Sequence, residues 1–367
     1  MQLVVRKNDL LRELQLFQGI IERKNTIPIL ANVLIEANKD EVKLLATDLE
    51  VALRSRCPAT VGKSGSLTLP AKKLYEILRA LPETDIRIEE DKKGVRVAAD
   101  RFDSRIQTLP REDFPTLPET TGKERAILPW AALKEMVAKT QFAITGEDTR
   151  FFLNGAKFLL RPESLVMVAT DGHRLSLVEV KHNVGVTEEI GVILPKKTIL
   201  ELGKLLSEGE GDVFFERGEN HLFFEVNGRV LISRMIDGQF PAYERVIPKK
   251  NDKKIEFEKE RLTNAVRRVA LLSNERSRSV KVEVTKGKVD VTSSSSEFGE
   301  AREELAVDYD GDTLEISFNA QYVLDFLNAV ETDVVALSLK DDVSQAVMTP
   351  VNAEGYEYTY VIMPMRI

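Results

Sequence analysis

The sequence predicts an α+β protein built from three copies of one domain, in which helices pack on antiparallel sheets. The chain has 367 residues, more than one hydrophobic core usually serves, and this length suits two or three domains. A helix followed by strands occurs twice in each copy, and this order favours two helices on one face of sheets of antiparallel neighbours. The period of about 120 residues far exceeds that of solenoid repeats, so each copy is a full domain.

A polar turn at the end of an alternating strand is the most regular motif of the repeat. Ala46-Thr47-Asp48-Leu49-Glu50 in the first copy corresponds to Ala169-Thr170-Asp171-Gly172-His173-Arg174 in the second, and Val289-Asp290-Val291-Thr292 is a fainter third copy. Apolar residues that alternate up to a polar turn are typical of a strand end. We therefore expect a structural joint in every copy, and only the middle joint carries Gly172-His173-Arg174.

The first copy begins with a predicted helix over Lys7 to Ile21, because its apolar residues recur at helical spacing, and Asn8 or Asp9 is expected to cap its start. A second helix is predicted over Ala71 to Leu81, directly after a proline. Strands are expected at Asn32 to Glu36, Val42 to Thr47, Glu50 to Cys57, Asp85 to Glu89, Gly94 to Ala98 and Asp103 to Thr108.

The same order returns twice. Helices are expected near Trp130 to Phe142 and Lys196 to Leu206 in the second copy, and near Lys259 to Leu272 and Asn319 to Ala329 in the third. The strands of these copies are expected within Phe151 to Val178, Asp212 to Glu216, Leu222 to Val226, Arg229 to Ser233, Ser279 to Val291, Val334 to Leu339, Val343 to Met348 and Tyr356 to Met363.

Three domains are predicted, at residues 1–120, 125–247 and 252–367. The segment Glu119 to Glu124 is rich in threonine and contains a glycine, and Pro248 to Asp252 reads Pro-Lys-Lys-Asn-Asp. Both compositions are typical of linkers.

A cytoplasmic protein is expected from what the sequence lacks. No secretory apolar run follows Met1, and no segment approaches the roughly 20 apolar residues of a membrane span, so no membrane contact is predicted. Cys57 is the single cysteine, which excludes an intrachain disulfide, and we interpret it as a small core residue. The net charge of -7 repels nucleic acid on average, so a DNA contact requires basic groups to gather locally.

Asp171 and His173 invite a catalytic interpretation, since such a pair can activate a nucleophile. The chain has three histidines in all, however, and it lacks a Gly-x-Ser-x-Gly elbow and any paired pattern of metal ligands. Asp48 repeats Asp171 without a nearby histidine. We therefore predict no catalytic residue, no metal and no cofactor. An enzyme acting on nucleotides is the alternative, and a hydrolysis screen with and without magnesium would reveal it.

Six segments, in the same order, resemble the bacterial sliding clamp, the beta subunit of DNA polymerase III. They span the whole chain in register with the repeat and are Thr26-Ile27-Pro28-Ile29-Leu30, Ala46-Thr47-Asp48-Leu49-Glu50, Ala169-Thr170-Asp171-Gly172-His173-Arg174-Leu175, Leu271-Leu272-Ser273-Asn274-Glu275, Phe318-Asn319 with Tyr322-Val323-Leu324, and Met363-Pro364-Met365-Arg366. The resemblance implies three DNA-clamp domains per chain and a ring of two head-to-tail chains, with helices lining a pore around duplex DNA.

The resemblance also implies a function and partners. It implies a non-catalytic processivity factor that holds the replicative polymerase on DNA. The implied partners are double-stranded DNA of any sequence, a second copy of the chain, the catalytic subunit of DNA polymerase III, the clamp loader, and other DNA polymerases and repair proteins that carry clamp-binding peptides.

Basic residues gather on the predicted helices, which suits contact with phosphate. Such contact is independent of sequence and leaves a protein mobile along the duplex. The segment Ile21 to Asn25 lacks the Gly-Arg pair of many relatives, so Lys24 is the candidate there and Arg23 the reserve. Alternatively, each basic residue solvates a helix face. The DNA-binding candidates are Arg23, Lys24, Lys72, Lys73, Lys134, Lys139, Lys196, Lys197, Arg267 and Arg268.

The resemblance further implies a cleft for partner peptides between the second and third domains. Apolar residues flanked by arginines, with methionines in the tail, suit an adaptable surface. Alternatively, Leu175, Val246 and Val361 are core residues and Met363 to Ile367 is a frayed end. The cleft candidates are Arg150, Leu153, Thr170, Gly172, His173, Arg174, Leu175, Pro241, Arg245, Val246, Val361, Met363, Pro364, Met365 and Arg366.

Opposite charges around two apolar centres predict a head-to-tail dimer. The arginines belong to the first domain and the glutamates to the third. A monomeric scaffold is the alternative, which light scattering would distinguish. The interface candidates are Arg96, Arg101, Arg105, Ile106, Leu271, Leu272, Glu297, Glu300, Glu303 and Glu304.

Overall fold

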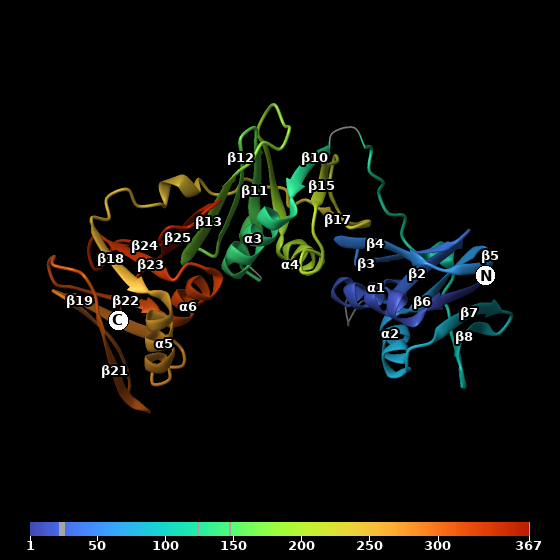
Figure 1. Cartoon of the computed structure of the whole chain (residues 1–367), viewed down its shortest axis with the longest axis horizontal. Coiled ribbons are helices and arrows are strands. Elements are labelled where there is room, and N and C mark those ends of the chain that lie inside the picture. Colours follow the sequence, from blue (N-terminus) through green and yellow to red (C-terminus); the bar gives the residue numbers. More distant parts are fainter. Residues whose placement is uncertain (22–25, 123–124, 147, 367) are drawn as a thin grey trace. The chain divides into compact units, whose positions relative to one another are not determined.

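The computed structural model describes residues 1–21, 26–122, 125–146 and 148–366. The chain divides into two compact units, Met1–Lys134 with Lys197–Met235, and Glu135–Lys196 with Ile236–Ile367. The strand pairs of the described residues are antiparallel, so the predicted α+β class is confirmed. The α-helices of this part are α1 (Lys7–Ile20), α2 (Ala71–Ala80), α3 (Trp130–Thr140), α4 (Lys196–Leu205), α5 (Lys259–Ala270) and α6 (Ala320–Ala329), two for each copy (Figure 1).

The first unit contains a five-stranded and an eight-stranded sheet. The five-stranded sheet has the order β5 (Thr60–Lys63), β1 (Gln2–Arg6), β7 (Asp85–Asp91), β8 (Gly94–Ala99) and β9 (Phe102–Ile106). The eight-stranded sheet has the order β10 (Arg125–Pro129), β15 (Asp212–Arg217), β16 (His221–Val226), β17 (Arg229–Arg234), β4 (Val51–Pro58), β3 (Glu41–Thr47), β2 (Asn32–Asn38) and β6 (Gly65–Pro70). Helix α1 packs on β1, β3 and β4, and α2 on β2 and β6.

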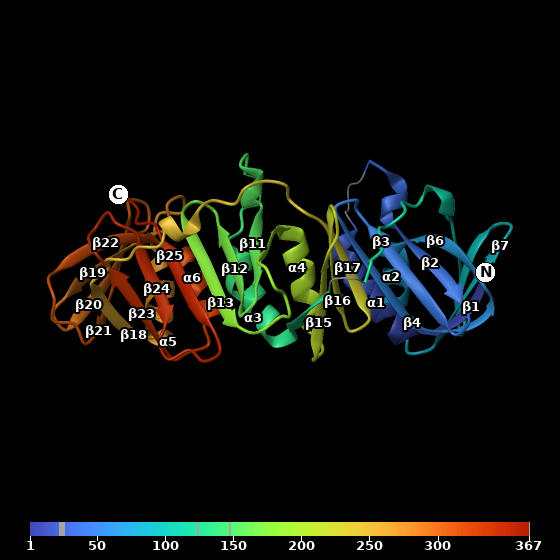
Figure 2. The ribbon, with the colours of Figure 1, turned by 90° about the horizontal axis from the view of Figure 1, so that it is seen from above.

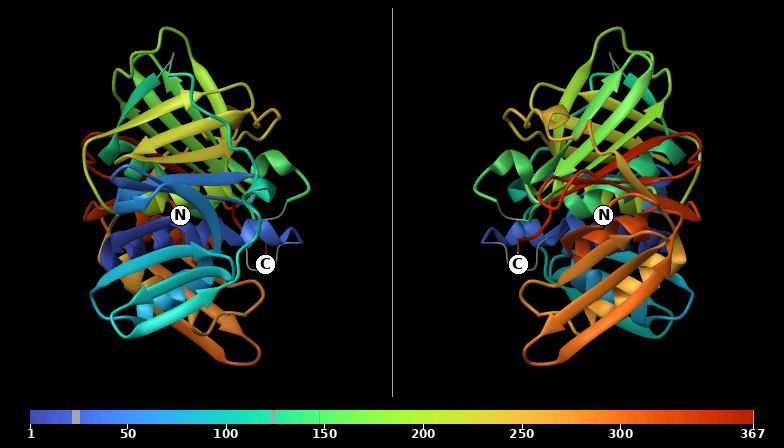
Figure 3. Two further views of the ribbon diagram at one scale, coloured as in Figure 1. Left: turned by 90° about the vertical axis from the view of Figure 1, so that its right-hand side faces the viewer. Right: turned by 90° about the vertical axis from the view of Figure 1, so that its left-hand side faces the viewer.

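The second unit contains an eight-stranded and a four-stranded sheet. The larger has the order β14 (Ile190–Pro195), β11 (Gly155–Arg161), β12 (Ser164–Thr170), β13 (Arg174–Lys181), β25 (Glu357–Ile362), β24 (Ala346–Pro350), β23 (Val334–Leu339) and β18 (Lys253–Glu258). The smaller has the order β21 (Gly299–Ala306), β20 (Lys288–Ser295), β19 (Ser279–Thr285) and β22 (Leu314–Asn319). Helix α5 packs along β19, β20 and β21, drawn in orange in Figure 3.

Each eight-stranded sheet joins two copies of the repeat. In the first unit β4 of the first copy pairs with β17 of the second, with Ala52 opposite Ile232. In the second unit β13 of the second copy pairs with β25 of the third, with Leu175 opposite Val361, and Figure 2 shows these two strands side by side. Backbone pairing makes each sheet continuous across a copy boundary.

Helices in this fold begin directly after strands rather than after capped loops. Helix α1 follows β1 without a break, its N-cap residue is Arg6, and no side chain caps it, so the predicted cap at Asn8 or Asp9 is wrong. Helix α6 also follows its strand, β22, directly, but it has a side-chain cap, because the side chain of Asn319 accepts a hydrogen bond from Gln321 N. Short 3₁₀ turns complete the described chain at Pro28–Ala31, Arg111–Asp113, Gln141–Ala143, Phe151–Leu153 and Tyr243–Arg245.

Cys57 lies in β4 and is 5% exposed. Burial, with the nearby charges of Glu13 and Asp9, raises the pKa of its thiol to about 12. A neutral, covered thiol is a poor nucleophile, and the interpretation of Cys57 as a core residue is confirmed.

The buried ion pair between Glu13 and Arg229 links α1 of the first copy to β17 of the second. Arg229 donates two hydrogen bonds to the carboxylate, at 2.6 and 2.8 Å, and the two side chains are 6% and 13% exposed. A buried charge that loses its partner is costly.

We therefore expect Glu13→Ala to lower the free energy of unfolding of the chain by about 2 to 3 kcal/mol, because Arg229 would remain buried without its carboxylate. Urea denaturation followed by circular dichroism measures this. Glu76→Gln is the control, since Glu76 pairs with Lys73 in an exposed position, and it should leave the midpoint unchanged. Equal midpoints for all three proteins would contradict a stabilising role for the pair.

Candidate binding pocket

The turn from Thr170 to Arg174, here called the cleft turn, links β12 to β13 and is held by its own side chains. Thr170 Oγ1 donates to the carbonyl of Arg174 at 2.6 Å and accepts from Gly172 N at 3.1 Å. Asp171 Oδ1 accepts from the backbone N–H groups of His173 and Arg174, at 2.9 and 3.0 Å. Gly172 has a φ of 87°, a left-handed conformation that glycine adopts without steric cost.

An apolar pocket of about 190 Å³ lies beside the cleft turn, and we call it the cleft pocket. Its floor is continuous with a buried cluster, because Leu175, Tyr243 and Val361 belong to both. Val246 and Met363 are 39% and 37% exposed, so large apolar surface remains open to solvent there. The complete lining is Arg150, Leu153, Thr170, Gly172, Arg174, Leu175, Pro241, Tyr243, Val246, Val361 and Met363.

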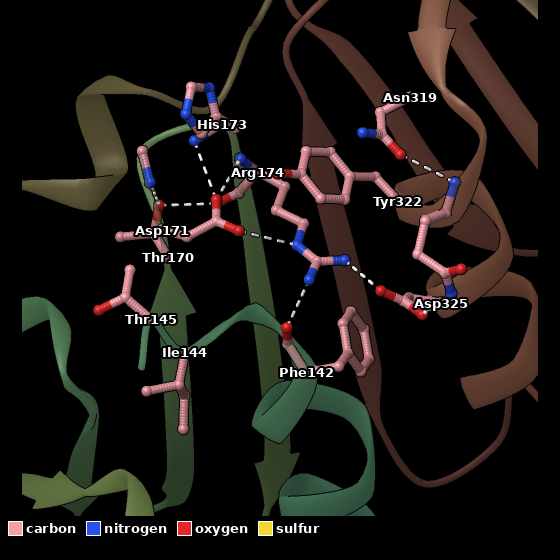
Figure 4. A network of polar contacts seen from close by, with 12 residues as sticks. Phe142, Ile144, Thr145, Thr170, Asp171, His173, Arg174, Asn319, Tyr322 and Asp325 are labelled. Carbon is pink, nitrogen blue, oxygen red and sulfur yellow. Dashed lines mark hydrogen bonds and ion pairs between the residues drawn. The ribbon is translucent and has the colours of Figure 1, made fainter. Parts of the chain in front are cut away.

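Arg174 is the buried charge of this pocket and is 9% exposed. Its guanidinium donates to Asp171 at 3.1 Å, to Asp325 of α6 at 2.5 Å and to the carbonyl of Phe142 at 2.5 Å, as Figure 4 shows. Its Cζ also lies 4.2 Å from the ring centroid of Tyr322. Four groups from three segments, namely the cleft turn, the turn after α3 and α6, thus fix one side chain.

The charge of Arg174 is stabilised by these neighbours. Burial alone lowers the pKa of a guanidinium, but Tyr360, Asp325 and Asp171 outweigh it, so the pKa of Arg174 is raised above its ordinary value. Arg174 therefore remains charged, and it ties the cleft turn to α6.

Most of the predicted cleft residues are brought together at this pocket, but five do not line it: His173, Arg245, Pro364, Met365 and Arg366. Tyr243 lines the pocket without having been predicted. It lies between two predicted residues, Pro241 and Val246, and this position is the feature of the sequence from which Tyr243 could be predicted as a pocket residue. The imidazole of His173 points away from Arg174 (Figure 4).

The chain end is tied to the body of the second unit through its backbone. Met363 N donates to the carbonyl of His173 at 2.9 Å, and Met365 N donates to the carbonyl of Ser317 at 2.7 Å. Leu175 and Val361 are both core residues and pocket residues, so the two interpretations of these side chains are compatible.

The basic candidates differ in their environment. Lys139 is 2% exposed and pairs with Glu135. Its prediction as a DNA contact is wrong, because a buried, paired ammonium cannot reach a phosphate. Lys196 donates to the carbonyl of Ile144, and Lys197 pairs with Asp48; both are half-buried. Arg23 and Lys24 lie outside the described residues. The candidates that are exposed are Lys72, Lys73, Lys134, Arg267 and Arg268.

Most of the interface candidates lie at two sheet edges, in the turns that lead to them or just after α5, whereas Arg96 lies in β8, the strand next to an edge. Arg105 and Ile106 belong to β9, and Glu300, Glu303 and Glu304 belong to β21; these are the outermost strands of their sheets. Leu271 is 78% exposed.

Several of the interface charges are paired within the chain. Arg96 pairs with Asp103, and Arg105 with Asp91 at 2.6 Å. Glu303 pairs with Arg268 at 2.6 Å. Fewer of the interface candidates are therefore unpaired and ready to form ion pairs with a second chain than the sequence indicates.

Within the described residues, no cluster of three or more His, Cys, Asp or Glu side chains could hold a metal ion. None of the helices in this part of the chain combines the length and the apolar character that crossing a membrane requires.

Comparison with known proteins gives matches along the whole chain. Residues 1–118, 127–242 and 244–366 match the N-terminal, central and C-terminal domains of the DNA polymerase III beta subunit. The beta sliding clamp of Pseudomonas putida is 37% identical over 371 residues, with both chains covered completely. A crystal structure of the DNA polymerase III subunit beta from Pseudomonas aeruginosa is 35% identical and covers both chains completely, with a TM-score of 0.94.

A beta sliding clamp structure from Caulobacter crescentus is 36% identical and has a TM-score of 0.93, covering 100% of this chain and 99% of that one. That structure carries polyethylene glycol at a candidate region for beta-motif tethering.

The Arg174 network generates a prediction about stability. Asp325→Ala should lower the free energy of unfolding by roughly 2 to 3 kcal/mol, because it leaves a buried guanidinium with one counterion fewer. Urea denaturation measures the loss. Gln321→Ala is the matched control, since Gln321 hydrogen-bonds the other carboxylate oxygen of Asp325 in an exposed position and should change little. If both variants unfold at the wild-type midpoint, Asp325 does not stabilise Arg174.

Proposed function

This chain belongs to the family of the DNA polymerase III beta subunit, the bacterial beta sliding clamp, and from that membership we propose how its residues do the work of a clamp. Members of the family are non-catalytic processivity factors, and so is this chain. We propose that two copies close head to tail into a ring around duplex DNA, in the cytoplasm, with clamp domains at residues 1–120, 125–247 and 252–367.

The cleft pocket is the proposed site for partner peptides, and its open apolar surface is the observation that carries this assignment. Val246 and Met363 leave apolar surface exposed above a buried floor, and exposed apolar patches of this kind mark interaction sites. An extended peptide can anchor one large apolar side chain there. Arg150, which is exposed at the rim and pairs with Asp148, suits an acidic residue beside the anchor, for which it would exchange Asp148.

The proposed partners at this pocket are the catalytic subunit of DNA polymerase III, the clamp loader, and other DNA polymerases and repair proteins with clamp-binding peptides. Burying one aromatic or leucine anchor contributes roughly 1.5 to 3 kcal/mol, while ordering the peptide offsets much of the gain. Micromolar affinity is expected, and it permits partners to exchange.

Sequence-independent binding of DNA is assigned to exposed basic side chains on the helices. Lys72 and Lys73 of α2, Lys134 of α3, and Arg267 and Arg268 of α5 are exposed. Arg268 must exchange its carboxylate partner Glu303 for phosphate. Salt should weaken such contacts without any dependence on base sequence.

Ring closure is assigned to the open edges of β9 and β21 and to the exposed Leu271. An outermost strand presents unpaired backbone groups that a second chain can complete. Two unlike edges give a head-to-tail contact, and two such contacts close a ring.

A ring makes a distinctive prediction about DNA topology. The wild-type chain, placed on a nicked circular plasmid by a clamp loader, should co-elute with the plasmid on gel filtration and be lost once the plasmid is linearised, because a ring slides off free ends. The double variant Leu271→Ala, Leu272→Ala should be monomeric at low micromolar concentration and should not be retained, since interface anchors contribute roughly 2 kcal/mol or more each.

Light scattering gives the mass of each protein, and Val343→Ala, an exposed apolar residue outside these edges, is the control. A dimeric double variant would contradict the interface assignment. Wild-type protein that stays on linear DNA would contradict the ring.

The cleft pocket makes a prediction about peptide affinity. Val246→Asn should weaken binding of a fluorescent polymerase-tail peptide about tenfold, the equivalent of about 1.4 kcal/mol, because it puts an amide where the anchor packs. Fluorescence anisotropy measures the affinity. Val343→Asn, which lines neither this pocket nor its turn, should leave it unchanged. If Val246→Asn binds the peptide as the wild type does, the peptide lies elsewhere.

A further inference from the structure

A second pocket in the first unit is built like the cleft pocket, and no role for it has been assigned so far. It has a volume of about 320 Å³ and lies beside the turn that links β3 to β4. Its apolar lining includes Leu49, Leu117 and Ile232. We call it the Leu49 pocket.

The turn of the Leu49 pocket repeats the hydrogen bonds of the cleft turn. Thr47 Oγ1 donates to the carbonyl of Val51 at 3.2 Å and accepts from Leu49 N at 2.9 Å. Asp48 Oδ1 accepts from the backbone N–H groups of Glu50 and Val51, at 2.9 and 2.7 Å. These four bonds join the same atoms, position by position, as the four bonds of the cleft turn.

The strands beneath the two turns also correspond. Ala52 stands opposite Ile232 in the pairing of β4 with β17, as Leu175 stands opposite Val361 in the pairing of β13 with β25. Pro115, which follows Phe114, lines the Leu49 pocket as Pro241 lines the cleft pocket. The two pockets therefore lie at equivalent positions of two successive copy boundaries.

Leu49 is the clearest sign that the Leu49 pocket is open to a ligand. Its side chain is 47% exposed, and its φ is 80°, in the left-handed region where a non-glycine residue is strained. Gly172 occupies the corresponding position of the cleft turn. A large apolar side chain at this position adds apolar surface to the rim and is not required to form the turn.

The rim of the Leu49 pocket differs in charge from that of the cleft pocket. Glu50 is exposed and is the one acidic or basic side chain of the lining apart from His221. Burial first, and then the charge of Arg234, lowers the pKa of His221, so this imidazole is neutral at pH 7.5. The cleft pocket has the exposed Arg150 at its rim instead.

We propose that the Leu49 pocket is a second peptide-binding site, which takes an extended segment of a partner protein that carries one large apolar side chain beside a lysine or arginine. The apolar side chain fills the space above Ile232, between Leu49 and Leu117. The basic neighbour pairs with Glu50. Because the cleft pocket favours acidic neighbours, the two sites of one chain bind different peptides. One chain can therefore bind two partners at once.

The test uses the full chain and two fluorescein-labelled peptides that share a Leu-Phe core, one flanked by lysines and one by aspartates. Fluorescence anisotropy should show that Leu49→Asn weakens the lysine-flanked peptide about tenfold or more and leaves the aspartate-flanked peptide unchanged. Asparagine tolerates a positive φ, so this variant should fold, and urea denaturation verifies that it does. Glu50→Lys should reverse the preference of this site from lysine flanks to aspartate flanks.

Val246→Asn is the matched variant, because it should weaken only the aspartate-flanked peptide. The proposal is overturned if the lysine-flanked peptide does not bind the wild type, if Leu49→Asn binds it normally, or if Val246→Asn abolishes its binding, since it would then occupy the cleft pocket. Failure of the aspartate-flanked peptide to bind would instead count against the proposed function of the cleft pocket, so the two proposals fail separately.

Discussion

Antiparallel pairing between strands of successive copies is the constraint on which the functional geometry depends. The pairing of β4 with β17 and that of β13 with β25 each bring a polar turn of one copy next to a strand of the following copy. An apolar pocket lies at each of these two joints. The backbone hydrogen bonds between paired strands do not depend on which side chains the strands carry. The strand pairing is therefore the same at both joints although the residues around the two pockets differ.

A cation locks each turn to the end of a helix. Lys197 pairs with Asp48 and donates to the carbonyl of Ile20, the last residue of α1. Arg174 pairs with Asp171 and donates to the carbonyl of Phe142, just after α3. A helix C-terminus carries partial negative charge and unsatisfied carbonyls, so each cation is stabilised both by the carboxylate of the turn and by the helix end. Some basic residues at helix ends therefore stabilise the fold of this acidic chain rather than bind a partner.

The two joints differ where they meet solvent. The rim of the cleft pocket has Gly172 and the exposed Arg150, whereas the rim of the Leu49 pocket has Leu49 and Glu50. Charge at a rim sets which partner binds more than how tightly it binds. Under the two proposals, repeated architecture with altered rims gives one chain two docking sites of different chemistry.

The repeat, the helices and most strands can be predicted from the sequence, because these follow from local periodicity and from the recurring turn motif. The strands expected from the sequence leave out β5, β21 and the six strands that run directly into helices without a turn signal, which are β1, β6, β10, β14, β18 and β22. Which side chains share a pocket depends on the tertiary fold. It buried Lys139, brought Asp325 to Arg174 from 151 positions away, and added Tyr243 to the lining, because contacts between distant segments depend on strand pairing between copies, which no local pattern encodes.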